Sequence, residues 1–226
     1  MGLEIDLAAD ICKRMGVECE WVRQDFATLI PALQQDKIDV LFMSLAITPK
    51  RQEMVAFSTP FSAPRQGLLV LKTSPLAASV GEGNIEVAAL DDAAQPAIAT
   101  LAKALQGKVI GTDAGSSRVE MAQRYFPGLE LRTYPSPADA KRELLASHID
   151  ADLASRGVLV TDDSSQLQRI GPWFIGGAFG PGSGVGLRKT DTQLQGKLDA
   201  AIKAALADGT IKDLYLRYYH NWSPPM

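Results

Sequence analysis

The sequence predicts an α/β protein with two lobes, and three observations support this fold class. Short apolar runs alternate with helical patterns from residue 3 to residue 71, which is typical of an α/β layer. Residues 73–106 then change character, beginning with the turn-rich stretch TSPLAASVGEGN and continuing Ala-rich. The same alternation of strand and helix returns from residue 108 to residue 155, so a second layer follows the first.

The composition is ordinary for a globular protein and disfavours two classes of protein. The chain has 226 residues, 46% of them apolar and 22% charged, and its formal net charge is -3. The basic residues are dispersed and the balance is slightly acidic, so no nucleic-acid partner is expected. No apolar run approaches the roughly 18 residues that a membrane-spanning helix needs. No signal peptide is recognised, and Met1-Gly2 leads straight into a helical pattern, which suggests that a preceding segment was cut off or was never present.

The first predicted element is a helix that ends at Gly16. Apolar residues recur every four positions, at Leu3, Leu7, Ile11 and Met15. Cys12 falls in the last turn of this helix, and Cys19 opens the segment CEWV, which alternates like a strand. From these residues alone, the two cysteines are either free thiols in a reducing compartment or the ends of a short disulfide.

Two segments of the first layer carry candidate binding residues. Residues 25–35 are expected to form a helix with Phe26 in its first turn, where the ring is either core or a platform for a ligand. In the stretch DVLFMSLAITPKR, Val40–Met43 is expected as a buried strand and Ser44-Leu45-Ala46 as a small-residue turn that a ligand can approach.

The same stretch ends at Arg51, in the first turn of a helix that Thr48 is predicted to cap. The helix macrodipole disfavours a cation at this place, so local helix stability does not explain the arginine. Arg51 is therefore either a solvated surface residue or, together with free backbone amides, the partner of an anion such as a carboxylate.

The remaining elements follow the same patterns. Strands are expected at 55–57, 67–71, 108–112, 129–134 and 148–153, and helices at 96–105, 118–125, 137–146 and 191–219, the last with a turn at 208–210. The glycine-rich residues 176–186 are expected to be a flexible crossing. In the turn that opens the helix at 118, Gly115, Ser116 and Ser117 either face an anion or simply cap the helix. His148 and His220 are too isolated to form a metal site.

Several segments together resemble a known family. In chain order they are LEIDLAADICKRMG, DFATLIPALQQDKIDVLFMSLAITPKRQEMVAFSTPF, GKVIGTDAGSS, IDADLAS and GSGVGLRKTD with ALADGTIKDLYLRYY. They are similar to bacterial periplasmic solute-binding proteins for polar amino acids, in the branch of lysine/arginine/ornithine, histidine and opine binders of ABC importers.

The resemblance covers nearly the whole chain and implies a type II, Venus-flytrap fold. Lobe 1 would consist of residues 1–72 and 182–226, and lobe 2 of residues 73–181. An amino acid or opine would bind between the lobes. The protein would be periplasmic, and its ligand-bound form would deliver the ligand to the permease of an ABC transporter. The resemblance implies neither a cofactor nor a metal, and it implies a disulfide between Cys12 and Cys19.

The resemblance also implies a role for each candidate residue of the binding site. Arg51 would clamp the α-carboxylate, and Ser116 and Ser117 with the amides of the Gly115 turn would complete its pocket from the other lobe. Phe26 would be the platform for the ligand side chain, and Ser44 would meet the α-amino group.

Two positions depart from the family pattern. Ser155 stands where many members have an acid for the α-ammonium, and Ala46 replaces a residue that commonly bears a hydroxyl. An unpaired ammonium is costly in a closed site, so a plain amino acid is expected to bind less well. The ligand is therefore expected to be an opine-like or otherwise N-substituted amino acid, or binding is weak.

Family members also begin with a strand of lobe 1 that has no counterpart in this sequence. Three interpretations stay open: the sequence is a fragment, another chain fills the gap by strand exchange in a homodimer, or the protein is a truncated homologue with weak or no ligand binding. An exposed sheet edge that favours dimerisation or aggregation is therefore expected. The main functional alternative is an enzyme similar to cyclohexadienyl dehydratase, for which Asp113 or Asp152 would be the general acid. A sensory binding module is disfavoured, because no signalling domain is recognised in the sequence.

Overall fold

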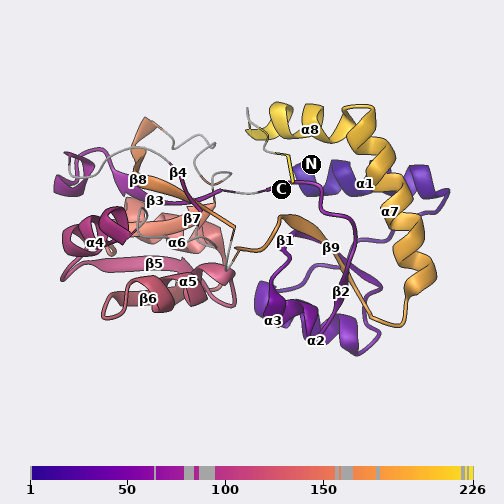
Figure 1. Ribbon diagram of the computed structural model, residues 1–226, viewed down its shortest axis with the longest axis horizontal. Coiled ribbons are helices and arrows are strands. Elements are labelled where there is room, and N and C mark those ends of the chain that lie inside the picture. Colours follow the sequence, from indigo (N-terminus) through magenta and orange to yellow (C-terminus); the bar gives the residue numbers. More distant parts are fainter. Residues whose placement is uncertain are drawn as a thin grey trace. The chain divides into compact units, whose positions relative to one another are not determined.

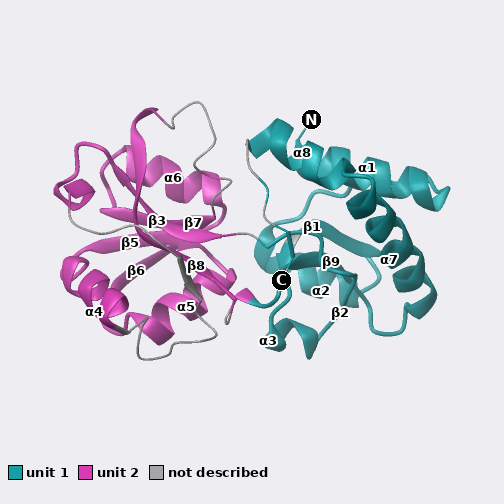
Figure 2. Ribbon diagram, turned by 45° about the horizontal axis from the view of Figure 1, so that its top comes forward, with its two compact units in different colours: residues 1–64, 180–226 teal, residues 65–179 magenta. Residues whose placement is uncertain are grey.

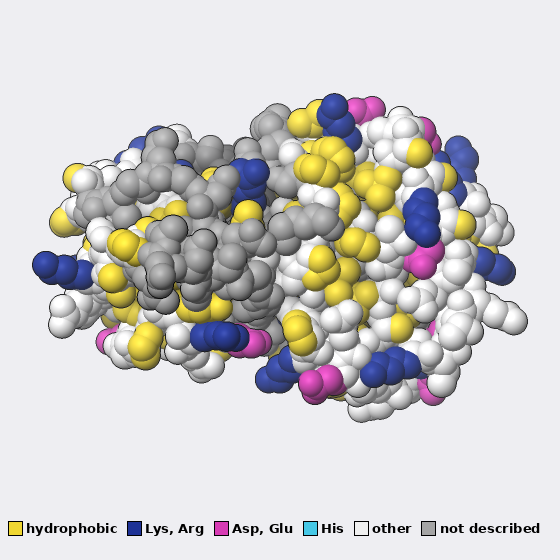
Figure 3. All heavy atoms as spheres, viewed as in Figure 1, with side chains coloured by type: hydrophobic (Ala, Val, Ile, Leu, Met, Phe, Trp, Pro, Cys, Tyr) yellow, Lys and Arg dark blue, Asp and Glu magenta, His cyan; other side chains and the backbone are white. Residues whose placement is uncertain are grey.

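The fold was analysed in a computed structural model, which consists of two compact units (Figures 1 and 2). Unit 1 comprises residues 1–64 and 180–226, and unit 2 comprises residues 65–179. The structure describes residues 2–63, 65–78, 84–86, 95–155, 158, 165–176, 179–219, 222, 224 and 225. Within these ranges, no helix combines the length and apolar character needed to cross a bilayer. On the face seen in Figure 3, Lys and Arg side chains are scattered rather than gathered in one patch.

Unit 1 is built around a three-stranded antiparallel sheet with the strand order β1-β9-β2. The strands are β1 (Val40–Ala46), β2 (Ala56–Phe57) and β9 (Ser183–Leu187). The helices are α1 (Leu3–Met15), a 3-10 turn (Phe26–Thr28), α2 (Leu29–Gln34), α3 (Pro49–Gln52), α7 (Thr192–Ala207) and α8 (Thr210–Tyr219). One apolar cluster joins β9 to α1, α7 and α8, and a second joins β1 to α2, so helices cover both faces of the sheet.

The structure corrects two expectations about this sheet. Ser44-Leu45-Ala46 is not a turn, because β1 continues through it and pairs Leu45 with Gly184 and Ala46 with Ser183. The segment 176–186 is not only a flexible crossing, because its second half forms β9. A Cβ atom at Gly186 would lie 3.2 Å from a Leu41 side-chain atom, so close packing of β1 against β9 accounts for this glycine.

Strand β1 lies at an edge of the sheet. Among the described strands it pairs only with β9, and its register shifts between Leu41 and Leu45, which indicates a bulge. The homodimer formed by strand exchange stays a prediction.

Helix α1 and the segment after it are held by a disulfide, as the resemblance implied. Gly16 ends the helix in a left-handed conformation (φ 68°), and Cys12 and Cys19 are bonded to each other, with their Cα atoms 6.2 Å apart. The expectation of a strand at CEWV was wrong, because residues 17–25 contain neither helix nor strand. The disulfide therefore anchors an irregular segment that leads to Phe26.

Removing this disulfide is expected to lower stability modestly. The double variant C12S/C19S should lose at most about 3 kcal/mol of unfolding free energy, because the closed loop is short and constrains the unfolded chain little. Urea denaturation of the variant, beside the wild type with and without a reducing agent, measures the effect. A loss well above this value would show that the disulfide also supports native packing.

Unit 2 is built around a six-stranded mixed sheet with the strand order β4-β8-β3-β7-β5-β6. Its strands are β3 (Gln66–Leu71), β4 (Asn84–Glu86), β5 (Val109–Asp113), β6 (Glu130–Tyr134), β7 (Ala151–Ser155) and β8 (Leu167–Ile175). Its helices are a 3-10 turn (Pro75–Ala78), α4 (Gln95–Ala104), α5 (Ser117–Tyr125) and α6 (Pro137–Leu145). Apolar side chains of α4 and α5 pack in one cluster with the sheet and those of α6 in another, so helices cover both faces.

The boundaries between the two units lie at other positions in the sequence than those expected. The first boundary lies between residues 64 and 65 rather than between 72 and 73, and the second between 179 and 180 rather than between 181 and 182. The first difference has a clear cause, because β3 pairs with β7 on one side and with β8 on the other. Its backbone hydrogen bonds therefore place β3 in unit 2.

Candidate functional site

In unit 1, the structure brings three of the predicted binding residues together. Thr48 caps α3 by accepting a hydrogen bond from the backbone nitrogen of Arg51 at 3.3 Å, and Pro49 is the first helical residue. The Arg51 side chain donates from Nη1 to the carbonyl oxygen of Ala46 at 3.0 Å, and its guanidinium carbon lies 5.6 Å from the centre of the Phe26 ring. Arg51, Ala46 and Phe26 therefore form one group.

The burial of Arg51 and the hydrogen bond of its backbone amide decide between the two interpretations of this residue that the sequence left open. The residue is only 8% exposed, so it is not the solvated surface arginine that the sequence left open. Its backbone amide is occupied by Thr48, so the anion-binding capacity of this place lies in the guanidinium rather than in a free amide. Ser44 lies in β1, and its side chain is outside the described part of the structure.

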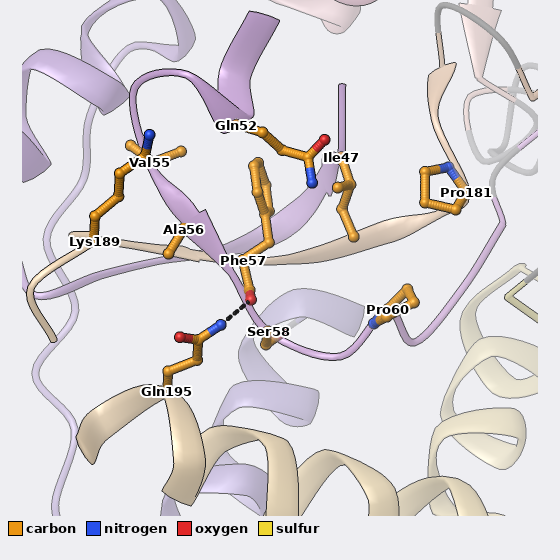
Figure 4. A pocket seen from close by; sticks show the side chains of 10 residues that line it. All are labelled: Ile47, Gln52, Val55, Ala56, Phe57, Ser58, Pro60, Pro181, Lys189 and Gln195. Carbon is orange, nitrogen blue, oxygen red and sulfur yellow. Dashed lines mark hydrogen bonds between the residues drawn. The ribbon is translucent and has the colours of Figure 1, made fainter. Parts of the chain in front are cut away.

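Unit 1 also contains a surface pocket of about 420 Å³, with Gln52 of α3 in its lining (Figure 4). Gln195 of α7 donates from Nε2 to the carbonyl oxygen of Phe57 at its wall, at 2.7 Å. The pocket is lined by Ile47, Gln52, Val55, Ala56, Phe57, Ser58, Pro60, Pro181, Lys189 and Gln195. None of the predicted binding residues belongs to this lining, although Ile47 and Gln52 are the sequence neighbours of Ala46 and Arg51.

In unit 2, the predicted anion-binding turn lies between β5 and α5. Gly115 has a left-handed conformation (φ 73°), which only glycine adopts easily. Ser116 is the N-cap residue of α5, but its hydroxyl donates back to the carbonyl oxygen of Asp113 at 2.8 Å and does not cap the helix. Ser117 begins the helix and is 9% exposed. The first amides of α5 thus have no side-chain cap, which is the state that an anion-binding turn requires.

Ser155 lies at the carboxyl end of β7 and is half-buried. Its partner in the neighbouring strand β3 is Gln66, so the two side chains lie on the same face of the sheet. Position 155 therefore has a hydroxyl and a neighbouring carboxamide, where many members of the resembling family have an acid.

A buried polar network connects the α5 turn with Gln66. Arg118, in the first turn of α5, donates to Asp113 from Nε at 3.1 Å and also from Nη2. Its Nη1 donates to Oε1 of Gln66 at 2.8 Å, and its Nε also lies 3.3 Å from Oγ1 of Thr112. Asp113 and Gln66 are each 3% exposed. The sequence pattern did not single out Arg118 or Gln66, although Arg118 is a cation at a helix N-terminus, as Arg51 is.

Asp152 of β7 lies beside this network and is 1% exposed. Among the described residues its Oδ2 has no hydrogen-bond partner. Burial raises the pKa of Asp152 to about 7; the Arg118 and Lys141 cations lower this pKa, and the Asp113 carboxylate raises it. The carboxyl group is thus largely protonated in mildly acidic solution. Within the described residues, no group of three or more His, Cys, Asp or Glu side chains is arranged to hold a metal ion.

Comparison with known proteins extends over nearly the whole chain. The chain is 33% identical to the octopine-binding periplasmic protein of Rhizobium meliloti, covering 96% of this chain and 82% of that protein. It is 32% identical to the lysine/arginine/ornithine-binding periplasmic protein of Escherichia coli, covering 97% of this chain and 79% of that protein. The structure is similar to that of an ancestral arginine-binding protein bound to glutamine, with a TM-score of 0.77 and 26% identity, covering 98% and 88% of the two chains.

The model of one family matches residues 1–221, which include both units and every candidate binding residue. Both sequence relatives named above are described as periplasmic, and the ancestral protein has the same α/β fold. The expectation of a two-lobed α/β binding-protein fold is thereby confirmed. The chain belongs to the bacterial extracellular solute-binding proteins, family 3.

Proposed function

We propose that this protein captures an opine-like, N-substituted amino acid in the periplasm and delivers it to the permease of an ABC importer. The observation that carries the proposal is the buried Arg51 guanidinium, held against the Ala46 carbonyl and over the Phe26 ring. An arginine fixed in this way is suited to a carboxylate, because its planar donors match the two carboxylate oxygens.

Two groups of residues would bind the ligand α-carboxylate. Arg51 would supply the charge, and the turn at Gly115, Ser116 and Ser117 would supply backbone amides at the uncapped start of α5 together with the Ser117 hydroxyl. Phe26 would stack against the aliphatic or guanidinium side chain of the ligand. Ser44 would meet the ligand nitrogen through its carbonyl or hydroxyl group.

The proposal of an N-substituted ligand rests on the surroundings of Ser155. Of the carboxylates in the unit 2 network, Asp113 is engaged by two nitrogens of Arg118, and burial raises the pKa of Asp152 to about 7, which disfavours its charged form. A free α-ammonium would thus lack the acid that resembling proteins provide, and an unpaired ammonium is costly to bury. A secondary amine that carries its own carboxylate compensates its charge internally. The octopine-binding relative supports this ligand class.

Replacing Ser155 with aspartate tests this proposal. The variant S155D should bind arginine and lysine about tenfold more tightly than the wild type and octopine about tenfold more weakly, because a charged hydrogen bond contributes roughly 1.5–3 kcal/mol. Isothermal titration calorimetry measures both affinities. The variant S155N introduces a side chain of the same size as aspartate without the charge, so this control should change neither affinity in the same way.

The wild-type titration decides the proposal first. Tight binding of plain arginine or lysine, with no binding of octopine or nopaline, would contradict an N-substituted ligand. If S155D and S155N behave alike, the charge at this position does not determine the ligand.

The enzyme alternative would require a reachable general acid in unit 2. Asp113 is engaged by Arg118 through two donors, and Asp152 is enclosed by β7 and its neighbours. A general acid must come within hydrogen-bond distance of the substrate, and the Asp113 carboxylate is held by Arg118 instead. We therefore favour the binding function over a dehydratase.

A further inference from the structure

We propose that Arg118 is a positioning residue that selects the ligand by fixing the orientation of the Gln66 carboxamide beside Ser155. Arg118 accepts no hydrogen bonds, so the Gln66 atom that faces it must be the amide oxygen. The Gln66 amide nitrogen, a donor with two N–H groups, is then the part left for another partner. This inference rests on the proposed function, because it concerns the place where the ligand nitrogen and its substituent would bind.

The register of the sheet places Gln66 beside Ser155. Gln66 and Ser155 are direct partners in the antiparallel pair of β3 and β7, so their side chains are neighbours on one face. Among the described residues, no hydrogen-bond acceptor for the Gln66 amide nitrogen is found, whereas its oxygen is bound by Arg118 at 2.8 Å. Gln66 is 3% exposed, so its side chain is held in place rather than free in solvent.

Arg118 is itself firmly fixed. Asp113 receives hydrogen bonds from two of its nitrogens, and Thr112, which lies close to its Nε, donates from Oγ1 to the Leu153 carbonyl of β7 at 2.8 Å. The guanidinium is thus anchored to both β5 and β7 and cannot readily release Gln66.

The chemical consequence is a preference for an acceptor at this position. A rotated Gln66 could offer its oxygen to an ammonium, but Arg118 occupies that oxygen. What remains beside Ser155 is an amide N–H donor, which suits a carboxylate oxygen and not a positively charged amine. Arg118 and Gln66 thereby favour the acidic substituent of an N-carboxyalkyl amino acid over a free α-ammonium.

Two variants test this selection. Q66E keeps the shape of the side chain and its contact with Arg118 but removes the amide donor. It should lower the ratio of octopine to arginine affinity by roughly tenfold or more, because a site built to donate a hydrogen bond discriminates strongly. The double variant D113N/R118Q removes the buried ion pair without leaving one charge alone, and it frees Gln66 to rotate, so it should lower the same ratio by about fivefold.

Combining the variants tests whether Arg118 acts on the ligand through Gln66. If Arg118 acts through Gln66, D113N/R118Q should have no further effect on the affinity ratio in the Q66E background. The control R124Q changes the same charge at an exposed position of α5 and should leave the ratio unchanged.

Each outcome bears on a separate claim. An unchanged affinity ratio in Q66E, or an additive effect of D113N/R118Q in the Q66E background, would overturn the inference about Arg118. Failure of the wild-type protein to bind octopine or nopaline would instead overturn the proposed function, and it would be seen before any variant is made.

Discussion

Replacing Arg51 with methionine is expected to abolish useful affinity for any α-carboxylate ligand, with a loss of about 100-fold or more. The guanidinium is buried and held by the Ala46 carbonyl and the Phe26 ring, so a ligand carboxylate would lose a charged, preorganised partner. Removing one member of a buried charge pair typically costs roughly 2–5 kcal/mol of binding free energy. Calorimetric titration of R51M with octopine and with arginine measures this loss.

A matched control separates this effect from damage to the fold. Lys50 is the neighbouring residue of α3 and is exposed, so K50M should bind like the wild type. The thermal midpoint of ligand-free R51M shows whether the fold persists. An octopine analogue with an amide in place of the α-carboxylate adds a further check, because R51M should no longer distinguish the acid from the amide. Wild-type affinity in R51M would show that the α-carboxylate binds elsewhere.

Replacing Asp152 with asparagine is expected to change the pH dependence of stability. Burial raises the pKa of Asp152 to about 7, so the native state keeps its proton in a range where the unfolded chain, with an ordinary aspartate pKa of about 3.9, has released it. The native state then binds more protons than the unfolded state, and the free energy of unfolding falls as pH rises from about 4 to about 7. Above about pH 7 this contribution to the slope ends.

D152N should therefore lack this part of the slope. Between pH 5 and pH 8 the wild type should lose about 2–3 kcal/mol more unfolding free energy than D152N, at about 1.4 kcal/mol for each pH unit of the window. Urea denaturation at several pH values measures the difference. The exposed Asp213 of α8 provides the control D213N, which should keep the slope of the wild type. Parallel curves for D152N and the wild type would mean that Asp152 is ionised in the native state throughout this range.

Local sequence patterns predicted the helices whose ends are marked by capping or terminating residues. The four-residue spacing up to Gly16 predicted α1, and Thr48 with Pro49 predicted α3, because caps and stops act within a few residues. The strand at residues 167–175 was not anticipated, and its interior glycine and proline, Gly171 and Pro172, disfavour a strand. Its pairing with β3 and β4 decides its structure, and that information is not local.

In the candidate site, too, local sequence patterns identified only some of the residues. Arg51 was recognised because a cation at a helix start needs an explanation, and the structure places it with Phe26 and Ala46. Gln66 could not be recognised from its neighbours in sequence, because its importance comes from lying opposite Ser155 and accepting a hydrogen bond from Arg118. The side-chain bond of Ser116 to Asp113, rather than to the helix, is likewise a choice between two local partners that the sequence leaves open.

A thermal-shift comparison of the purified 226-residue protein with octopine, nopaline, arginine and lysine tests the central claim most directly. A ligand present at about a hundred times its Kd adds roughly 2.7 kcal/mol to the free energy of unfolding, which raises the melting temperature measurably. We expect octopine or nopaline to raise it and arginine and lysine to have little effect. A shift with arginine or lysine but not with the opines, or no shift with any of the four, would contradict the claim that this chain binds an N-substituted amino acid.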